Sequence, residues 1–182
     1  MKNIITILIK ILFIITIFSQ KSWSSNFDKN NPPSEIAKNF NKSHIIGQDR
    51  LTFFGFNIYD IALWSEDNVF SYDEKFAISI KYNKSFDEDD LVQRSIVEMR
   101  KNYNFSNAQE NIFEKELLRV FNDIKKGDFK TVIFNPKSGT KFYHNSQFNG
   151  AIEDQDLSRK FVDIWLHKNS SYPKITQKLL GK

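Results

Sequence analysis

The chain has 182 residues, a length that suits one domain. It contains no cysteine, which excludes a disulfide framework, a thiol nucleophile, a thiolate metal site and a lipidated lipoprotein cysteine. The formal net charge is +4, but Lys2, Lys10 and Lys21 belong to the first 24 residues, and without them the charge is +1. No cluster of arginines and lysines follows, so the sequence argues against a nucleic-acid-binding protein.

The first 24 residues have the pattern of a signal peptide. A positive N-terminus precedes an apolar run, Ile4–Phe18, of about 15 residues, which is short for a membrane span of roughly 20 residues. Ser22 and Ser24 supply the small residues that precede a cleavage site, here before Ser25. We predict a signal peptide over residues 1–24, a single domain over residues 25–182, and a periplasmic or secreted protein. The alternative is an uncleaved membrane anchor, which a lysine inside the apolar run disfavours.

A long aromatic stretch, residues 47–66, is the most distinctive part of the remaining chain. After a flexible lead-in and an ambiguous segment at 36–46, it reads GQDRLTFFGFNIYDIALWSE. Apolar residues fall on both faces of a period-2 pattern, which predicts one long strand with cover on each side. Gly55 suggests a bulge or a close backbone approach. Arg50 and Asp60 lie beside this apolar surface and need partners, since an isolated buried charge is very costly.

Alternation then predicts a second strand at residues 76–82, and two helices follow. Ser85 and Glu88 have the spacing of a capping box for a helix that runs to about Tyr103. The acidic residues 87–90 lack the glycine turn and alternating spacing of a calcium loop, so we interpret them as the first turn of this helix. Ser106 and Gln109 form a second capping box, for a helix that ends near residue 127 with a glycine cap.

The C-terminal third predicts a hairpin and two more helices. Residues 129–134 and 140–144 alternate around an Asn-Pro-Lys-Ser-Gly turn, and residues 147–152 add a short segment. An amphipathic helix begins after Asp154 or Asp156, and Pro173 opens a last short helix. Strands, two helices, strands and two helices in this order predict an α+β fold, with the helices on one face of a mostly antiparallel sheet.

Recognisable catalytic motifs are few. His44, His144 and His167 are scattered and form no metal-binding motif, and no serine has the surroundings of a hydrolase nucleophile. The Lys-Ser-Gly-Thr string at 137–140 lies in the predicted hairpin turn and is not a phosphate loop. Arg50 with Tyr59 and the surrounding apolar residues remains as a candidate site. The alternative for Arg50 is a structural arginine, paired to Asp60 or to a carbonyl group.

Four segments, in this order, resemble the bacterial chalcone isomerase-like family. They read GQDRLTFFGFNIYDIALWSE, KGDFKTVIFNPKSGTKFYHN, GAIEDQDLSRKFVDIWL and YPKITQKLLG, and the resemblance covers roughly residues 40 to 181. It implies an open-faced β-sandwich, in which a large antiparallel sheet is backed by helices and a ligand cleft lies between them. In the plant enzymes of this fold an arginine at the position of Arg50 holds substrate oxygens. Tyr59 falls where those enzymes have a catalytic threonine, so the resemblance does not imply chalcone cyclisation.

These patterns together predict an exported protein that binds a small amphipathic or anionic ligand. Relatives of the fold that bind fatty acids use the same arginine for the carboxylate, so the resemblance implies Arg50 as anchor with Tyr59 nearby. The apolar ligand body is expected along Phe54, Phe56 and Ile58, or along the opposite strand face. We expect no cofactor and no metal. The alternatives are an intramolecular lyase, or isomerase, on an enone-like substrate and a non-catalytic envelope interaction protein whose cleft is packed core.

Overall fold

The computed structural model describes residues 27–182. The predicted signal peptide therefore lies outside the described residues. The secondary structure follows in chain order: α2 (Ser34–Asn39), β1 (His44–Phe53), β2 (Phe56–Ser65), β3 (Phe76–Tyr82), α3 (Glu88–Asn102), α4 (Asn107–Leu118), β4 (Phe129–Asn135), β5 (Gly139–His144), β6 (Gln147–Ile152), α5 (Gln155–Leu166) and α6 (Pro173–Leu179). None of the helices in this part of the chain is long and apolar enough to cross a membrane.

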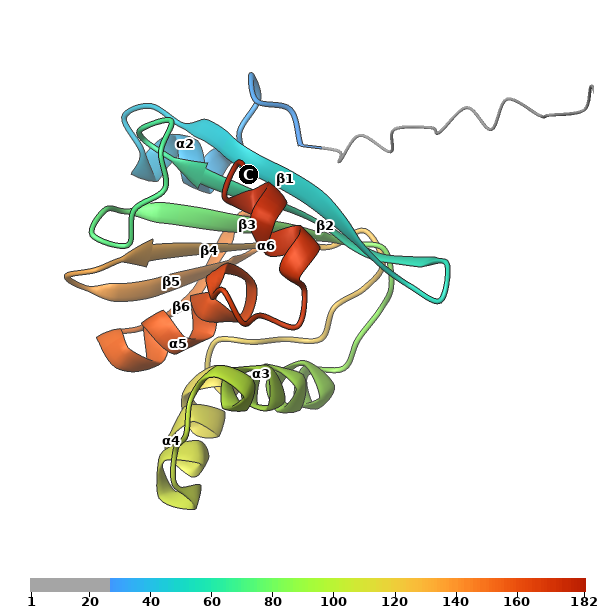
Figure 1. The fold of residues 1–182 in the computed structure, drawn as a ribbon, viewed down its shortest axis with the longest axis vertical. Coiled ribbons are helices and arrows are strands. Elements are labelled where there is room, and N and C mark those ends of the chain that lie inside the picture. Colours follow the sequence, from blue (N-terminus) through green and yellow to red (C-terminus); the bar gives the residue numbers. More distant parts are fainter. Residues whose placement is uncertain (1–26) are drawn as a thin grey trace, which may run out of the picture.

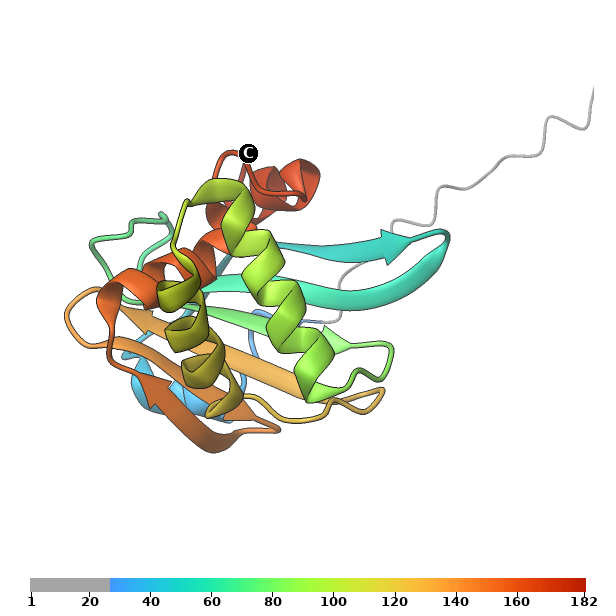
Figure 2. The ribbon, with the colours of Figure 1, turned by 90° about the horizontal axis from the view of Figure 1, so that it is seen from below.

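The strands form one sheet in which neighbours along the chain are neighbours in space. Its order is β1-β2-β3-β4-β5-β6, and every adjacent pair is antiparallel. Figures 1 and 2 show α3, α4, α5 and α6 on one face of this sheet and the short α2 on the other. The predicted α+β class, with a large antiparallel sheet backed by helices, is confirmed; α2 on the second face is an addition.

The stretch 47–66 is not one strand, as the alternation predicted, but a hairpin of β1 and β2. The chain reverses at Phe54 and Gly55, whose φ angles are 46° and 79°, and Phe53 pairs with Phe56 across the turn. Two consecutive residues with positive φ are typical of the tight turn that matches the twist of a hairpin. Because phenylalanine rarely adopts a positive φ, Phe54 gives no sequence signal for a turn. The alternating apolar residues on either side therefore look like one continuous strand.

Gly47 allows the last helix to pack closely on β1. A Cβ atom at this position would lie 1.8 Å from the backbone oxygen of Lys178, so only glycine leaves room for the C-terminal end of α6. The ambiguous segment before it is resolved as well: α2 takes residues 34–39, and β1 begins at His44. The turn expected around Gly47 is absent, because β1 continues through it.

Two predicted helix boundaries are wrong. The N-cap of α3 is Asp87, without a side-chain cap, and the Ser85 hydroxyl instead accepts a hydrogen bond from the backbone of Lys126. Helix α4 ends at Leu118, because the chain beyond it becomes extended and pairs Ile124 with Phe86. The Ser106 capping box, the strand at 76–82, the 129–144 hairpin and the start of α5 after Asp154 are confirmed.

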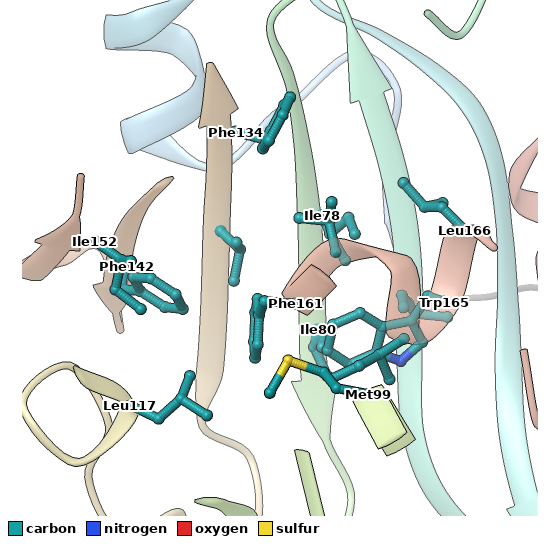
Figure 3. Close-up of a cluster of buried hydrophobic side chains, with 14 of the residues drawn as sticks. Ile78, Ile80, Met99, Leu117, Phe134, Phe142, Ile152, Phe161, Trp165 and Leu166 are labelled. Carbon is teal, nitrogen blue, oxygen red and sulfur yellow. The ribbon is translucent and has the colours of Figure 1, made fainter. Parts of the chain in front are cut away.

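Two apolar clusters hold the layers together, one on each face of the sheet. The larger lies between the sheet and α3–α6, where Figure 3 shows Phe161 and Trp165 of α5 beside Ile80 of β3 and Met99 of α3. The smaller lies under α2 and consists of Phe27, Ile36, Phe40, Ala62, Trp64, Ala77 and Ile133. Since successive strand residues point to opposite faces, β2 supplies Ile61 and Leu63 to the first cluster and Ala62 and Trp64 to the second.

Candidate functional site

A cavity of about 640 Å³ lies between the sheet and the helices that cover its larger face. Its walls come from β1 to β5, from α3 and α5, and from the segments that join these elements. Most of the lining is apolar or aromatic: Leu51, Phe53, Ile58, Ile80, Phe86, Leu91, Val97, Phe121, Val132, Phe142, Phe161, Ile164 and Trp165. A concave site of this size with a mostly apolar wall and few polar groups is typical of a small-molecule pocket.

Helix α3 forms the wall opposite the sheet. Figure 2 shows it lying across the sheet face. Val92, Ile96 and Met99 belong to its buried stripe, spaced as the sequence predicted, and they fix the helix on the core. Leu91, Arg94 and Glu98 lie on the adjoining face and border the cavity. The same helix therefore packs with one stripe and lines the cavity with the next.

Tyr59, which is buried, and Tyr82, which is partly buried, both line the cavity. The Tyr59 hydroxyl accepts a hydrogen bond of 2.9 Å from Trp165 Nε1. Burial raises the pKa of Tyr59 and of Tyr82 far above the ordinary value, so both phenols stay neutral at physiological pH. A neutral phenol that accepts one hydrogen bond still has its own hydrogen to donate, so Tyr59 can offer a donor inside an otherwise apolar wall.

Two of the charged groups that α3 brings to the cavity, Arg94 and Glu98, are paired with each other. Arg94 Nη2 lies 2.5 Å from Glu98 Oε1 and donates a second bond, of 3.0 Å, to the Tyr172 hydroxyl. Glu98 also contacts Lys101 Nζ at 3.2 Å. The hydrogen bond to Tyr172 is the main cause that raises the pKa of Arg94. This side of the cavity therefore carries a compensated set of charges.

Lys130 of β4 also lines the cavity, and its position differs from that of Arg94. Only 6% of Lys130 is exposed. Its ammonium group donates to Asn122 Oδ1 at 3.3 Å and lies 5.7 Å from the centre of the Phe121 ring. Desolvation lowers the pKa of this lysine to about 8. The sequence analysis missed Lys130, although its place two residues before Val132 on the inward side of a strand was a usable signal.

Of the predicted site residues, Ile58 and Tyr59 line the cavity. Phe54 and Phe56 do not: they lie at the tip of the β1–β2 hairpin and are 87% and 60% exposed. They leave the predicted wall because Phe54 occupies the turn itself, and Phe56 is the first residue of β2, at the exposed end of the hairpin. Phe53 and Leu51, from the other face of the predicted strand, are in the lining instead.

Arg50 is not found in the cleft, contrary to expectation. Its Nε lies 2.5 Å from Asp60 Oδ1, and its Nη2 lies 3.1 Å from Asp60 Oδ2. Asp60 lies directly opposite Arg50 in the sheet and is fully buried, one residue from Tyr59 along β2. Neighbouring strand residues point to opposite faces, so Tyr59 meets the cavity whereas Asp60 and Arg50 meet the face of α2. The pairing is the structural alternative that the sequence left open.

Within residues 27–182 no three histidine, aspartate or glutamate side chains gather in a way that could hold a metal ion.

Comparisons with known proteins agree with this architecture. An uncharacterised protein of Haemophilus influenzae is 28% identical over 138 residues, which cover 75% of this chain and 67% of that protein. The crystal structure of the Arabidopsis thaliana fatty-acid binding protein AtFAP1 superposes with a TM-score of 0.58 at 11% identity, over 78% of this chain and 88% of the other. This second likeness shows the shared fold. A family model described as chalcone isomerase-like matches residues 50–181. The chain therefore belongs to the chalcone isomerase-like family.

Proposed function

We propose that this protein binds a small amphipathic ligand, such as a fatty acid, in the cavity between the sheet and α3–α6, and that it does so after export. The observation that carries the proposal is the cavity itself, about 640 Å³ of space with a mostly apolar wall. Pockets that hold small molecules fall between about 300 and 1,000 Å³. A cleft of this size also argues against the alternative in which the cleft is merely packed core.

The driving force comes from the apolar part of the ligand. Each methylene group removed from water contributes about 0.8 kcal/mol before the ordering costs of binding. The cavity crosses the sheet from β5 to β1, which is four strand spacings or about 19 Å. Affinity should therefore rise with chain length until this span is filled. The name of the Arabidopsis structure, a fatty-acid binding protein with the same fold, supports this ligand class.

Isothermal titration calorimetry with a series of saturated fatty acids tests the proposal. Val97 of α3 lies at the rim of the cavity, and Val97→Trp should narrow it and lower the affinity for the longer chains. Val69 is exposed and outside the lining, so Val69→Trp is the matched control and should bind as the wild type does. Affinities independent of chain length, or equal in both variants, would contradict binding in this cavity.

Export has a separate test. N-terminal sequencing of the protein from the exported fraction should begin at Ser25, because the small residues at 22 and 24 precede a cleavage site. Native mass spectrometry of the same material should reveal a small molecule that travels with the folded chain. An intact Met1 in the membrane fraction would contradict cleavage and leave the cavity proposal untouched.

A further inference from the structure

Lys130 places a buried cation in the wall of the cavity. The apolar lining of β4 and β5 continues through Val132 and Phe142, and Lys130 interrupts it on the inward face of β4. A buried ammonium group loses its hydration, and it is costly unless protein or ligand groups replace the water. Residues 27–182 give its nitrogen one hydrogen bond, the 3.3 Å contact with Asn122. An ammonium group has three hydrogens to donate, so capacity for a further partner remains.

The neighbouring charges leave Lys130 without an ion-pair partner in the described part of the chain. Glu88 and Asp128 act on it only through longer-range electrostatics. Asp128 is engaged elsewhere, since His144 Nε2 lies 3.1 Å from it and Asn145 Nδ2 donates to it at 3.0 Å. His144, beside Lys130 in the sheet, also contacts Asn122 Oδ1 at 3.3 Å. The positive charge of Lys130 is therefore only weakly compensated by neighbouring carboxylates.

The other cations near the cavity are less suited to hold an anion. Arg94 is already bound to Glu98 and Tyr172, and the carboxylates of Asp90 and Glu98 on the same helix would repel a second anion. Arg50 is bound by Asp60 through two contacts, outside the lining. Lys130 alone combines deep burial, a place in the wall and a single hydrogen bond among these three groups.

Resting on the proposed function, we propose that Lys130 is the anion anchor of the cavity: its ammonium group binds the acidic headgroup of the ligand, while the apolar tail runs across β3 and β2 toward Leu51 and Phe53. Carboxylate and phosphate headgroups share the required chemistry, because each presents an oxyanion that accepts a hydrogen bond from the ammonium group of Lys130. The tail then meets Ile80, Tyr59 and Ile58 in the order in which the strands lie.

Proton linkage follows from the same geometry. The pKa of Lys130 is lowered to about 8 by burial, and an anion bound to the ammonium group would raise it again. Binding at pH 8 should therefore take up about half a proton per ligand, and affinity should fall roughly tenfold per pH unit above pH 8 until the pKa of the complex is reached. The groups facing this site are Glu88, Asp128, His144, Asp90, Arg94, Glu98 and Tyr82.

Calorimetry with dodecanoate, dodecyl phosphate and 1-dodecanol tests the anchor on the full mature chain. Lys130→Met keeps a linear apolar stem and should weaken dodecanoate binding about 10- to 150-fold, as expected for the loss of a hydrogen bond to a charged group. It should leave the affinity for 1-dodecanol unchanged and should abolish the proton uptake. Lys130→Arg should retain most of the affinity for the anions. Lys141→Met, on the exposed side of β5, is the matched control and should behave as wild type.

The results separate the anchor from the cavity. Comparison of the two anionic probes shows which headgroup Lys130 prefers, and tighter binding of either over the alcohol supports the anchor. If Lys130→Met binds dodecanoate as tightly as the wild type, or if its pH dependence persists, the anchor is overturned while the cavity proposal stands. If the wild type binds none of the three probes, both proposals are overturned.

Discussion

Two buried charged sites on opposite faces of the sheet, Arg50 with Asp60 and Lys130, differ in how their charges are partnered. On the face of α2, Arg50 and Asp60 close on each other through two contacts beside a filled apolar cluster. On the face of α3–α6, Lys130 borders a cavity of about 640 Å³ and has one hydrogen bond within the described residues. Both faces use the same strands. A closed pair serves stability, and a cation beside an open space is suited to a ligand.

The largest expected change in stability comes from breaking the ion pair between Arg50 and Asp60. Arg50→Ala should lower the free energy of unfolding by about 3–5 kcal/mol, because it leaves Asp60 as a buried carboxylate without its main partner. Urea denaturation followed by circular dichroism measures this change. The double variant Arg50→Met/Asp60→Leu should recover most of the loss, since an apolar pair of similar volume replaces both charges. A single variant that remained stable but lost dodecanoate binding would place the headgroup at Arg50 instead.

On the cavity face, removing the buried charge of Lys130 is expected to stabilise the ligand-free protein. Lys130→Met should raise the free energy of unfolding of the ligand-free protein by up to about 3 kcal/mol at pH 7, because a pKa lowered from 10.5 to about 8 marks a charge that the folded state disfavours. A lysine with a lowered folded pKa binds fewer protons in the folded state than in the unfolded state between those values. Wild-type stability should therefore rise as pH increases from 8 to 10.5.

Thermal unfolding of wild type and Lys130→Met across this pH range checks the sign. The two melting temperatures should differ most below pH 8 and converge toward pH 10.5. Lys141→Met, with its side chain on the exposed side of β5, serves as control and should show no such convergence. A destabilised Lys130→Met at pH 7 would show that the lysine is a structural group and not one held in place for a ligand.

A smaller change in ligand affinity should distinguish residues in the wall of the cavity from residues at the tip of the β1–β2 hairpin. Ile58→Ala should weaken dodecanoate binding several-fold, because it removes apolar contact from the lining. Phe54→Ala should leave the affinity unchanged, since that ring projects into solvent beyond the turn. Calorimetric titration of both variants measures the difference. Equal losses would mean that the hairpin tip folds over the bound ligand.

The sequence predicted the layers of this fold better than it predicted the site. Regular alternation at residues 76–82 and the Ser106–Gln109 capping box depend on nearby residues, and both are present in the structure. The turn at Phe54 was missed because only the positive φ reveals it, and no Asn-Gly or Gly-Gly signal accompanies it. That missed turn also misplaced Phe54 and Phe56.

The other errors in the predicted site depend on which face of the sheet each side chain points to. Tyr59 and Asp60 are adjacent in sequence, yet one meets the cavity and the other binds Arg50 behind the sheet. Which side of a two-sided apolar strand carries the larger space depends on the helices packed against it, and α3 comes from a segment remote in the chain. The alternation of β4 could have placed Lys130 on the same face as Val132, but its burial and the cavity beside it depend on the tertiary structure.

Nuclear magnetic resonance of the isotopically labelled protein, titrated with dodecanoate, locates the ligand on one face of the sheet or the other. We expect large shifts for amides along the cavity face of β1–β4 and α3 and for the ammonium resonance of Lys130. Little change is expected around α2 and Trp64 on the other face. Nuclear Overhauser contacts should join the ligand methyl group to Leu51 or Phe53. Shifts centred on Arg50, Asp60 and α2, or no shifts at all, would contradict the claim that the cavity on the larger helical face is the ligand site.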